Sequence, residues 1–210
     1  MSTLRYCLAW VGVLTIAAGC SSAPPVDEDF DQSLDQPAAE SRGQPIEYLD
    51  EATGATVTAV NKALIFARDR SERAANLRDY VTLAAAVVNR GGKREYVLIA
   101  YIWSTLDTRN EPAKADADAL VLVADDRRIR LSANGRTPSD LGIARPVDAP
   151  SGQQVTPLVF PTDLATLRFV AAARSLQIQT AVAEVAVSYE LWEDQRPALD
   201  HFVRFLGGER

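Results

Sequence analysis

The sequence predicts an α+β fold in which a mainly antiparallel, sandwich-like β domain carries two short helices. Three observations lead to this fold class. Short runs rich in β-branched and apolar residues recur from residue 56 to residue 191. Turn-forming residues separate the clearest pairs of runs. Only two segments, both near the C-terminus, space their apolar residues as a helix does.

The clearest hairpin joins Tyr80–Asn89 to Tyr96–Thr105. Gly91 and Gly92 lie in the link between the two strands, and glycine adopts the positive φ angles of a tight turn. Both strands are apolar on both faces, which is typical of strands that are covered on both sides. We therefore expect this hairpin to be central in the sheet.

A second hairpin is predicted around Asp125-Asp126, with strands at Leu120–Ala124 and Arg127–Leu131. Apolar and arginine side chains alternate along its second strand, as in a strand with one buried face. Further strands are predicted at Thr56–Val60, Ala63–Ala67, Gln154–Phe160, Leu176–Gln179 and Ala183–Leu191. The segment 133–153, rich in glycine and proline, is predicted to be a long loop, and long loops are often functional.

Two helices are predicted between and after these strands. Thr162 follows Pro161 and is predicted to be the N-cap of the first helix, which continues to about Arg174. Pro197 suits the first position of the second helix. Its apolar stripe consists of Leu199, Phe202, Val203 and Leu206. The helix is predicted to end at Gly207-Gly208.

Residues 1–19 have the features of an export signal. Arg5 precedes 14 uncharged residues, 6–19, which are too few to span a bilayer core that needs about 20. Small residues then precede Cys20. The alternative to a lipidated cysteine at this point is an ordinary secretory signal with an incidental cysteine.

The segment Ile16-Ala17-Ala18-Gly19-Cys20 resembles the lipobox of bacterial lipoproteins, although Ala17 stands where leucine is commonest. The resemblance covers only about the first 20 residues. It implies cleavage before Cys20, a diacylglycerol thioether on that cysteine and, in many species, a further acyl chain such as palmitate. Ser21 resembles the residue found in outer-membrane-sorted lipoproteins. Several acyl chains on one residue would give a lasting membrane anchor.

Residues 20–47 are predicted to be a disordered tether, since they are rich in proline and acids and poor in large apolar side chains. Residues 20–52 hold nine acids and one base, a net charge of −8, whereas the whole chain is −6 and Arg5 is the only charge in 1–19. Residues 53–210 are therefore nearly neutral, at +1, which does not favour nucleic acid as a partner. Residues 48–210 have the length of a single globular domain.

The sequence predicts no catalytic, cofactor-binding or metal-binding site. Of the two cysteines, Cys7 leaves with the signal and Cys20 carries lipid. The only histidine, His201, lies off the apolar stripe of its helix and is interpreted as a surface residue. Asp116 and Asp118 offer too few oxygens for a calcium site, and no EF-hand spacing follows them.

Two other groups of residues were open to a functional interpretation. Four arginines could bind a phosphate or carboxylate, but interleaved acids favour a solvated mixed-charge surface; they are Arg68, Arg70, Arg73 and Arg78. Trp103 and the run Tyr189–Trp192 could form an exposed aromatic patch for a sugar or a partner, although core packing is the commoner role of such residues.

These features predict a non-catalytic lipoprotein of the bacterial envelope. It would be anchored in the outer membrane through lipid on Cys20 and would face the periplasm, where it would contact an envelope protein or the cell wall. One alternative is a periplasmic cell-wall hydrolase that uses carboxylates. Another is a small glycan- or lipid-binding module built on the aromatic patch.

Overall fold

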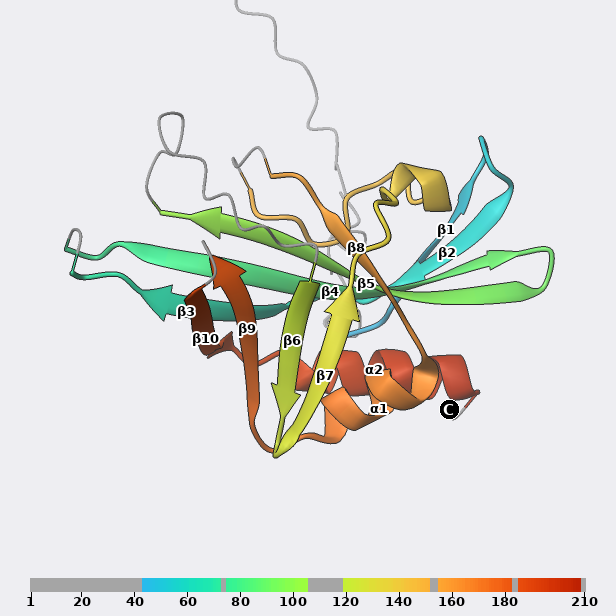
Figure 1. Ribbon diagram of the computed structural model, residues 1–210. Helices are drawn as coiled ribbons and strands as arrows, with labels where there is room; N and C mark the ends of the chain where they lie inside the picture. Colours follow the sequence, from blue (N-terminus) through green and yellow to red (C-terminus); the bar gives the residue numbers. More distant parts are fainter. Residues whose placement is uncertain (1–42, 73–74, 106–118, 152–154, 183–184, 209–210) are drawn as a thin grey trace, which may run out of the picture. The chain divides into compact units, whose positions relative to one another are not determined.

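A computed structural model describes residues 43–72, 75–105, 119–151, 155–182 and 185–208 (Figure 1). The predicted signal, Cys20 and almost the whole predicted tether lie outside these ranges, as do Asp116 and Asp118. The fold below is that of the described residues alone.

The described residues form one ten-stranded sheet, in which all neighbouring strands are antiparallel. The strands are β1 (Ile46–Asp50), β2 (Ala55–Ala59), β3 (Leu64–Asp69), β4 (Arg78–Arg90), β5 (Lys93–Ser104), β6 (Ala119–Ala124), β7 (Arg127–Ser132), β8 (Leu158–Thr162), β9 (Leu176–Val182) and β10 (Val185–Glu193). The two helices are α1 (Leu164–Ala172) and α2 (Arg196–Gly207). The predicted α+β class, with mainly antiparallel strands and two helices, is confirmed.

The long strand β4 organises the sheet. It pairs with β5 along its whole length, with β3 through its first half and with β2 through its second half. From β3 the order continues through β10, β9, β6 and β7, whereas β2 leads to β1 and β5 leads to β8. The prediction that the β4–β5 hairpin is central is therefore confirmed.

Different elements cover the two faces of the central hairpin (Figure 1). Helices α1 and α2 pack on each other beneath the sheet and bury apolar side chains such as Leu167 and Phe202. Residues 133–151 and 155–157, which we call the loop segment, lie on the opposite face and contain a short 3₁₀ helix at Ser139–Leu141. We call these the helix face and the loop face. Tyr101 and Trp103 belong to the loop face, since alternate residues of a strand share a face.

The turns explain why the two predicted hairpins form. Gly91 and Gly92 have φ angles of 58° and 86°, which match the two positive φ angles of a type I′ turn. Asp125, in the β6–β7 turn, has a φ of 51°, and its carboxylate accepts hydrogen bonds from the backbone N–H groups of Arg174 and Ser175. Asp125 therefore fixes the turn against the start of β9.

Three predicted boundaries need correction. The strand predicted at Gln154–Phe160 is β8, which begins only at Leu158 and ends at Thr162. The N-cap of α1 is Asp163, not Thr162, because the Asp163 carboxylate reaches the backbone N–H of Thr166 while Thr162 still pairs in the sheet. Strand β1 was not predicted, and its residues Ile46 and Glu47 fall within the predicted tether. It is an edge strand of only five residues, held by pairing with β2, and its apolar residues Ile46 and Leu49 are exposed and not part of the core.

Candidate functional site

Two hollows lie on the loop face beside the described residues of the loop segment, 133–151 and 155–157. Tyr101 is buried beneath this segment, and its hydroxyl oxygen accepts a hydrogen bond from the backbone N–H of Val147 at 3.2 Å. Burial raises the pKa of the Tyr101 hydroxyl, which therefore stays protonated at neutral pH. The carboxylate of the next residue, Asp148, accepts a hydrogen bond of 2.7 Å from the backbone N–H of Ala63.

The neighbouring part of the segment, around Gly142 and Arg145, packs against the β1–β2 hairpin. Gly142 has a φ of 79°, and a Cβ placed there would lie 2.3 Å from Thr53 Oγ1 and 3.3 Å from the Ala55 side chain. The guanidinium of Arg145 lies over the ring of Tyr48, 5.3 Å from its centroid. Contacts of residues 142–148 thus hold the middle of the loop on the sheet.

One hollow, which we call the Tyr101 hollow, has a volume of about 460 Å³. This volume lies within the range of small-molecule sites. Its wall is largely apolar, and Arg145 is the one charged residue among the described residues that line it. It is lined by Tyr101, Thr137, Pro138, Ser139, Ile143, Ala144, Arg145, Pro146, Ala149, Val155, Thr156 and Pro157.

A second hollow, the Trp103 hollow, has a volume of about 180 Å³ and lies on the other side of the same loop segment. Its wall combines an indole ring with two carboxylates, an ammonium group and an amide. It is lined by Lys62, Ala63, Ile65, Thr82, Trp103, Asp148, Ala149, Pro150, Ser151, Glu193 and Gln195. Ala149 belongs to the walls of both hollows.

An aromatic cluster adjoins the Trp103 hollow. Trp103 stacks on Tyr80, with ring centroids 4.2 Å apart and ring planes 14° apart, and its indole N–H donates to Thr82 Oγ1. The guanidinium of Arg78, two residues before Tyr80 on the same face of β4, lies 4.4 Å from the centroid of the Trp192 ring. We define the aromatic cluster as Arg78, Tyr80, Trp103 and Trp192.

A β-bulge brings Trp192 to this surface. The register of β10 against β3 shifts between Leu191 and Glu193, so that Trp192 is the extra residue. Its side chain is 52% exposed, although tryptophan is usually well buried. The next residue, Glu193, lines the Trp103 hollow. The two tryptophans that the sequence singled out thus contact two residues, Tyr80 and Arg78, on the same face of β4.

The structure places most of the other candidate residues away from these hollows. His201 is exposed on α2. Arg70 forms ion pairs with Asp79 at 3.0 Å and with Glu72 at 3.6 Å, and because Asp79 is buried, the Arg70–Asp79 pair is not part of a solvated surface. Of the remaining arginines in that group, Arg78 joins the aromatic cluster and Arg73 lies outside the described residues.

Sequence reasoning missed Tyr101, Asp148 and Glu193 as wall residues. Tyr101 was predicted only as part of a strand, and Asp148 is an isolated acid in a long loop. No local pattern indicates that Asp148 and Glu193 line one hollow, since this depends on how the loop lies on the sheet.

In the part of the chain that the structure describes, no group of three or more His, Cys, Asp and Glu residues is placed to hold a metal ion. Within the same residues, no helix is both long and apolar enough to cross a membrane. Comparison with protein families, with curated proteins and with solved structures finds no match to this chain.

Proposed function

We propose that this chain is a lipid-anchored protein of the bacterial envelope whose domain binds a partner, without catalysing a reaction, through the loop face of its sheet. The lipobox-like segment ending at Cys20 supports the anchor, and Ser21 supports an outer-membrane location facing the periplasm. The partner is an envelope protein or the cell wall.

The observation that carries the binding role is the exposure of Trp192. A half-exposed indole beneath a guanidinium offers a partner a large apolar surface together with a charged hydrogen-bond donor. Tryptophan and arginine are the residues that most often dominate binding energy at protein interfaces. The aromatic cluster suits that role for a protein or a glycan.

A carboxylate hydrolase of the cell wall is the second candidate, because Asp148 and Glu193 line the same hollow. Two observations favour binding over hydrolysis. Asp148 already accepts the Ala63 N–H and so holds the loop in place. The hollow, at about 180 Å³, is smaller than the roughly 300 Å³ at the lower end of small-molecule sites.

The anchor is tested by expressing the full chain in a Gram-negative host supplied with an alkyne-labelled palmitate. We expect label on the wild-type protein and none on a Cys20→Ala variant. Fractionation of the membranes then reports whether the labelled protein is in the outer membrane. Equal labelling of both proteins would exclude Cys20 as the lipidated residue.

The binding role is tested by chemical cross-linking of the same cells and by co-sedimentation with purified cell-wall sacculi. Trp192→Ala should abolish the cross-linked partner or the sedimentation. The matched control is Phe205→Ala, which removes another large side chain, 50% exposed, from helix α2. Unchanged binding by the Trp192 variant would contradict the proposed surface. Release of soluble fragments from sacculi by wild-type protein but not by a Glu193→Gln variant would favour the hydrolase instead.

A further inference from the structure

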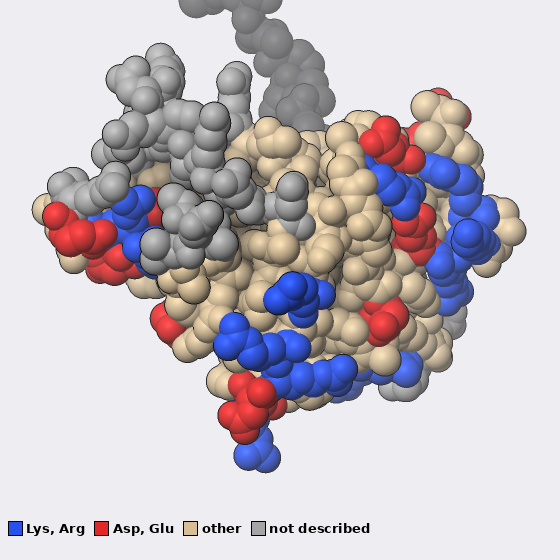
Figure 2. Space-filling model, viewed as in Figure 1, with Lys and Arg blue, Asp and Glu red and all other residues tan. Residues whose placement is uncertain are grey.

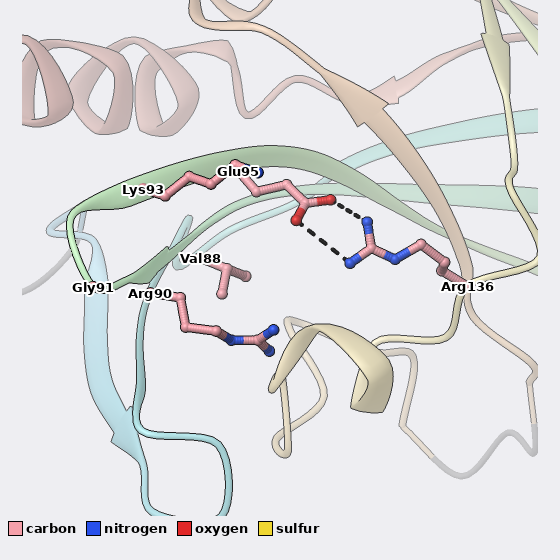
Figure 3. A pocket seen from close by; sticks show the side chains of 6 residues that line it. All are labelled: Val88, Arg90, Gly91, Lys93, Glu95 and Arg136. Atoms are coloured by element: carbon pink, nitrogen blue, oxygen red, sulfur yellow. Dashed lines mark hydrogen bonds and ion pairs between the residues drawn. The ribbon is translucent and has the colours of Figure 1, made fainter.

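A third hollow lies at the tip of the β4–β5 hairpin, away from the aromatic cluster (Figure 3). We call it the hairpin hollow. Its volume is about 630 Å³, and it is lined by Val88, Arg90, Gly91, Lys93, Glu95 and Arg136. Arg136 belongs to the loop segment, and the other five residues belong to the hairpin. Figure 2 shows basic side chains gathered at this end of the molecule.

Among the described residues that line the hairpin hollow, Glu95 is the single carboxylate, and its charge is already paired. Glu95 forms an ion pair with Arg136 through both of its oxygens, with Arg136 Nη2 3.4 Å from Glu95 Oε2 (Figure 3). Both side chains are more than a third exposed, so the pair mainly orients the Arg136 guanidinium and contributes little to stability. With this carboxylate paired, the hollow keeps the two positive charges of Arg90 and Lys93.

Arg90 and Lys93 have no counter-ion of their own among the described residues. They occupy directly opposite positions in the β4–β5 register, and both side chains are exposed. Like charges directly opposite each other on neighbouring strands destabilise a hairpin. An anion between them would replace this repulsion with two attractive contacts.

We propose that the hairpin hollow binds a phosphate monoester. Such a group carries a charge of about −1.5 to −2 at neutral pH, which matches the two unpaired cations. Arginine can donate two parallel hydrogen bonds to phosphate oxygens, and lysine adds a compact charge. Gly91 leaves the tip open, because a Cβ at that position would have no atom within 4 Å. This site is separate from the proposed aromatic surface and goes beyond the proposed function.

The binding test uses the purified full chain in neutral detergent and inorganic phosphate as the probe, followed by titration calorimetry. Replacing Arg90 and Lys93 together by glutamine should weaken binding by about tenfold for each cation removed. The matched control is Arg130→Gln with Arg168→Gln, which removes the same charge from exposed positions on β7 and α1. Equal weakening by both double variants, or no phosphate binding by the wild type, would overturn the proposal.

Glu95→Gln gives an independent test of the same site. It removes the one opposing charge of the hollow and releases Arg136 to contact the anion, so phosphate should bind more tightly than in the wild type. Unchanged or weaker binding by this variant would contradict the assignment. Thermal unfolding of each variant without phosphate verifies that the domain is folded.

The phosphate monoester could belong to a lipid head group or to a soluble phosphorylated sugar. To distinguish these sources, the lipidated chain is placed in phosphatidylcholine vesicles, and phosphatidic acid, a monoester, is added to the membrane. If phosphatidic acid in the vesicles competes with soluble phosphate for the chain, the ligand is a lipid head group. If it does not compete, the ligand is a soluble phosphate monoester. Equal competition by phosphatidylglycerol, a diester, would show general attraction of charge and would overturn the proposal.

Discussion

Asp148 and Ala63 are joined by a hydrogen bond of 2.7 Å from the Ala63 backbone N–H to the Asp148 carboxylate, although 85 residues separate them in the sequence. Asp148 adopts a φ of 44°, a conformation that aspartate and asparagine tolerate better than most residues. This contact fixes the loop segment where it forms a wall of the Trp103 hollow. Both the backbone conformation and the carboxylate of Asp148 are therefore needed there.

Asp148→Ala should lower the free energy of unfolding by about 1–2 kcal/mol, since it removes a charge-assisted hydrogen bond and leaves alanine at a positive φ. Asp148→Asn should lose less, because asparagine keeps an acceptor oxygen and tolerates the conformation. Urea unfolding measures both values. Equal losses in the two variants would show that the hydrogen bond to Ala63 does not hold the loop.

Gly142→Ala should destabilise the domain by about 2–4 kcal/mol, since the added Cβ would clash with Thr53 Oγ1 in addition to the cost of a positive φ. Gly135→Ala is the matched control. Position 135 has a similar φ of 67° but open space around its Cβ, so it should cost only about 1 kcal/mol. Combining Gly142→Ala with Thr53→Ala should restore part of the loss, and a loss unchanged in the double variant would exclude the clash.

The central part of the fold was predictable because local signals and tertiary pairing agree there. The β4–β5 and β6–β7 hairpins carry both an apolar pattern and a turn sequence, and each strand pairs with its neighbour in the chain. The apolar stripe of α2 likewise predicts the buried residues Leu199, Phe202 and Val203. In these elements the hydrophobic period alone determines which face is buried.

The hollows were not predictable for the opposite reason. The loop segment has few apolar residues and no regular period, so nothing in its sequence indicates that it covers the loop face. The ion pair of Arg136 with Glu95 depends on that placement, as does the position of Asp148 near Trp103. The exposure of Trp192 depends on a bulge in the long-range pairing of β10 with β3.

The stability of the β6–β7 turn should depend on pH through Asp125. Hydrogen bonds from the backbone N–H groups of Ser175 and Arg174 lower the pKa of this carboxyl below its ordinary value of about 3.9. The ionised carboxylate therefore contributes stability above that pH, and the contribution is lost as the pH falls through the lowered pKa. Asp125→Asn should be less stable than the wild type at pH 7.

Chemical unfolding of Asp125→Asn and wild type from pH 7 to pH 2.5 checks this expectation. The difference between the two should be constant at neutral pH and should shrink below about pH 4. Asp126→Asn removes the same charge one residue away and leaves the bonds of Asp125 in place. A difference between Asp125→Asn and wild type that grows in acid would contradict the assigned role.

The two tryptophans of the aromatic cluster should differ in their access to solvent. Trp192 is half exposed, whereas Trp103 stacks on Tyr80 and donates its N–H to Thr82. Trp192→Phe should therefore remove the fluorescence that acrylamide quenches most readily, and Trp103→Phe should leave it. Similar quenching curves for the two variants would show that Trp192 is covered in solution.

Ala149 gives the Tyr101 and Trp103 hollows a common partition. A molecule that displaces this residue on one side changes the space available on the other. A larger side chain at position 149 would therefore narrow both hollows at once, so the loop segment determines the size of both cavities through one residue.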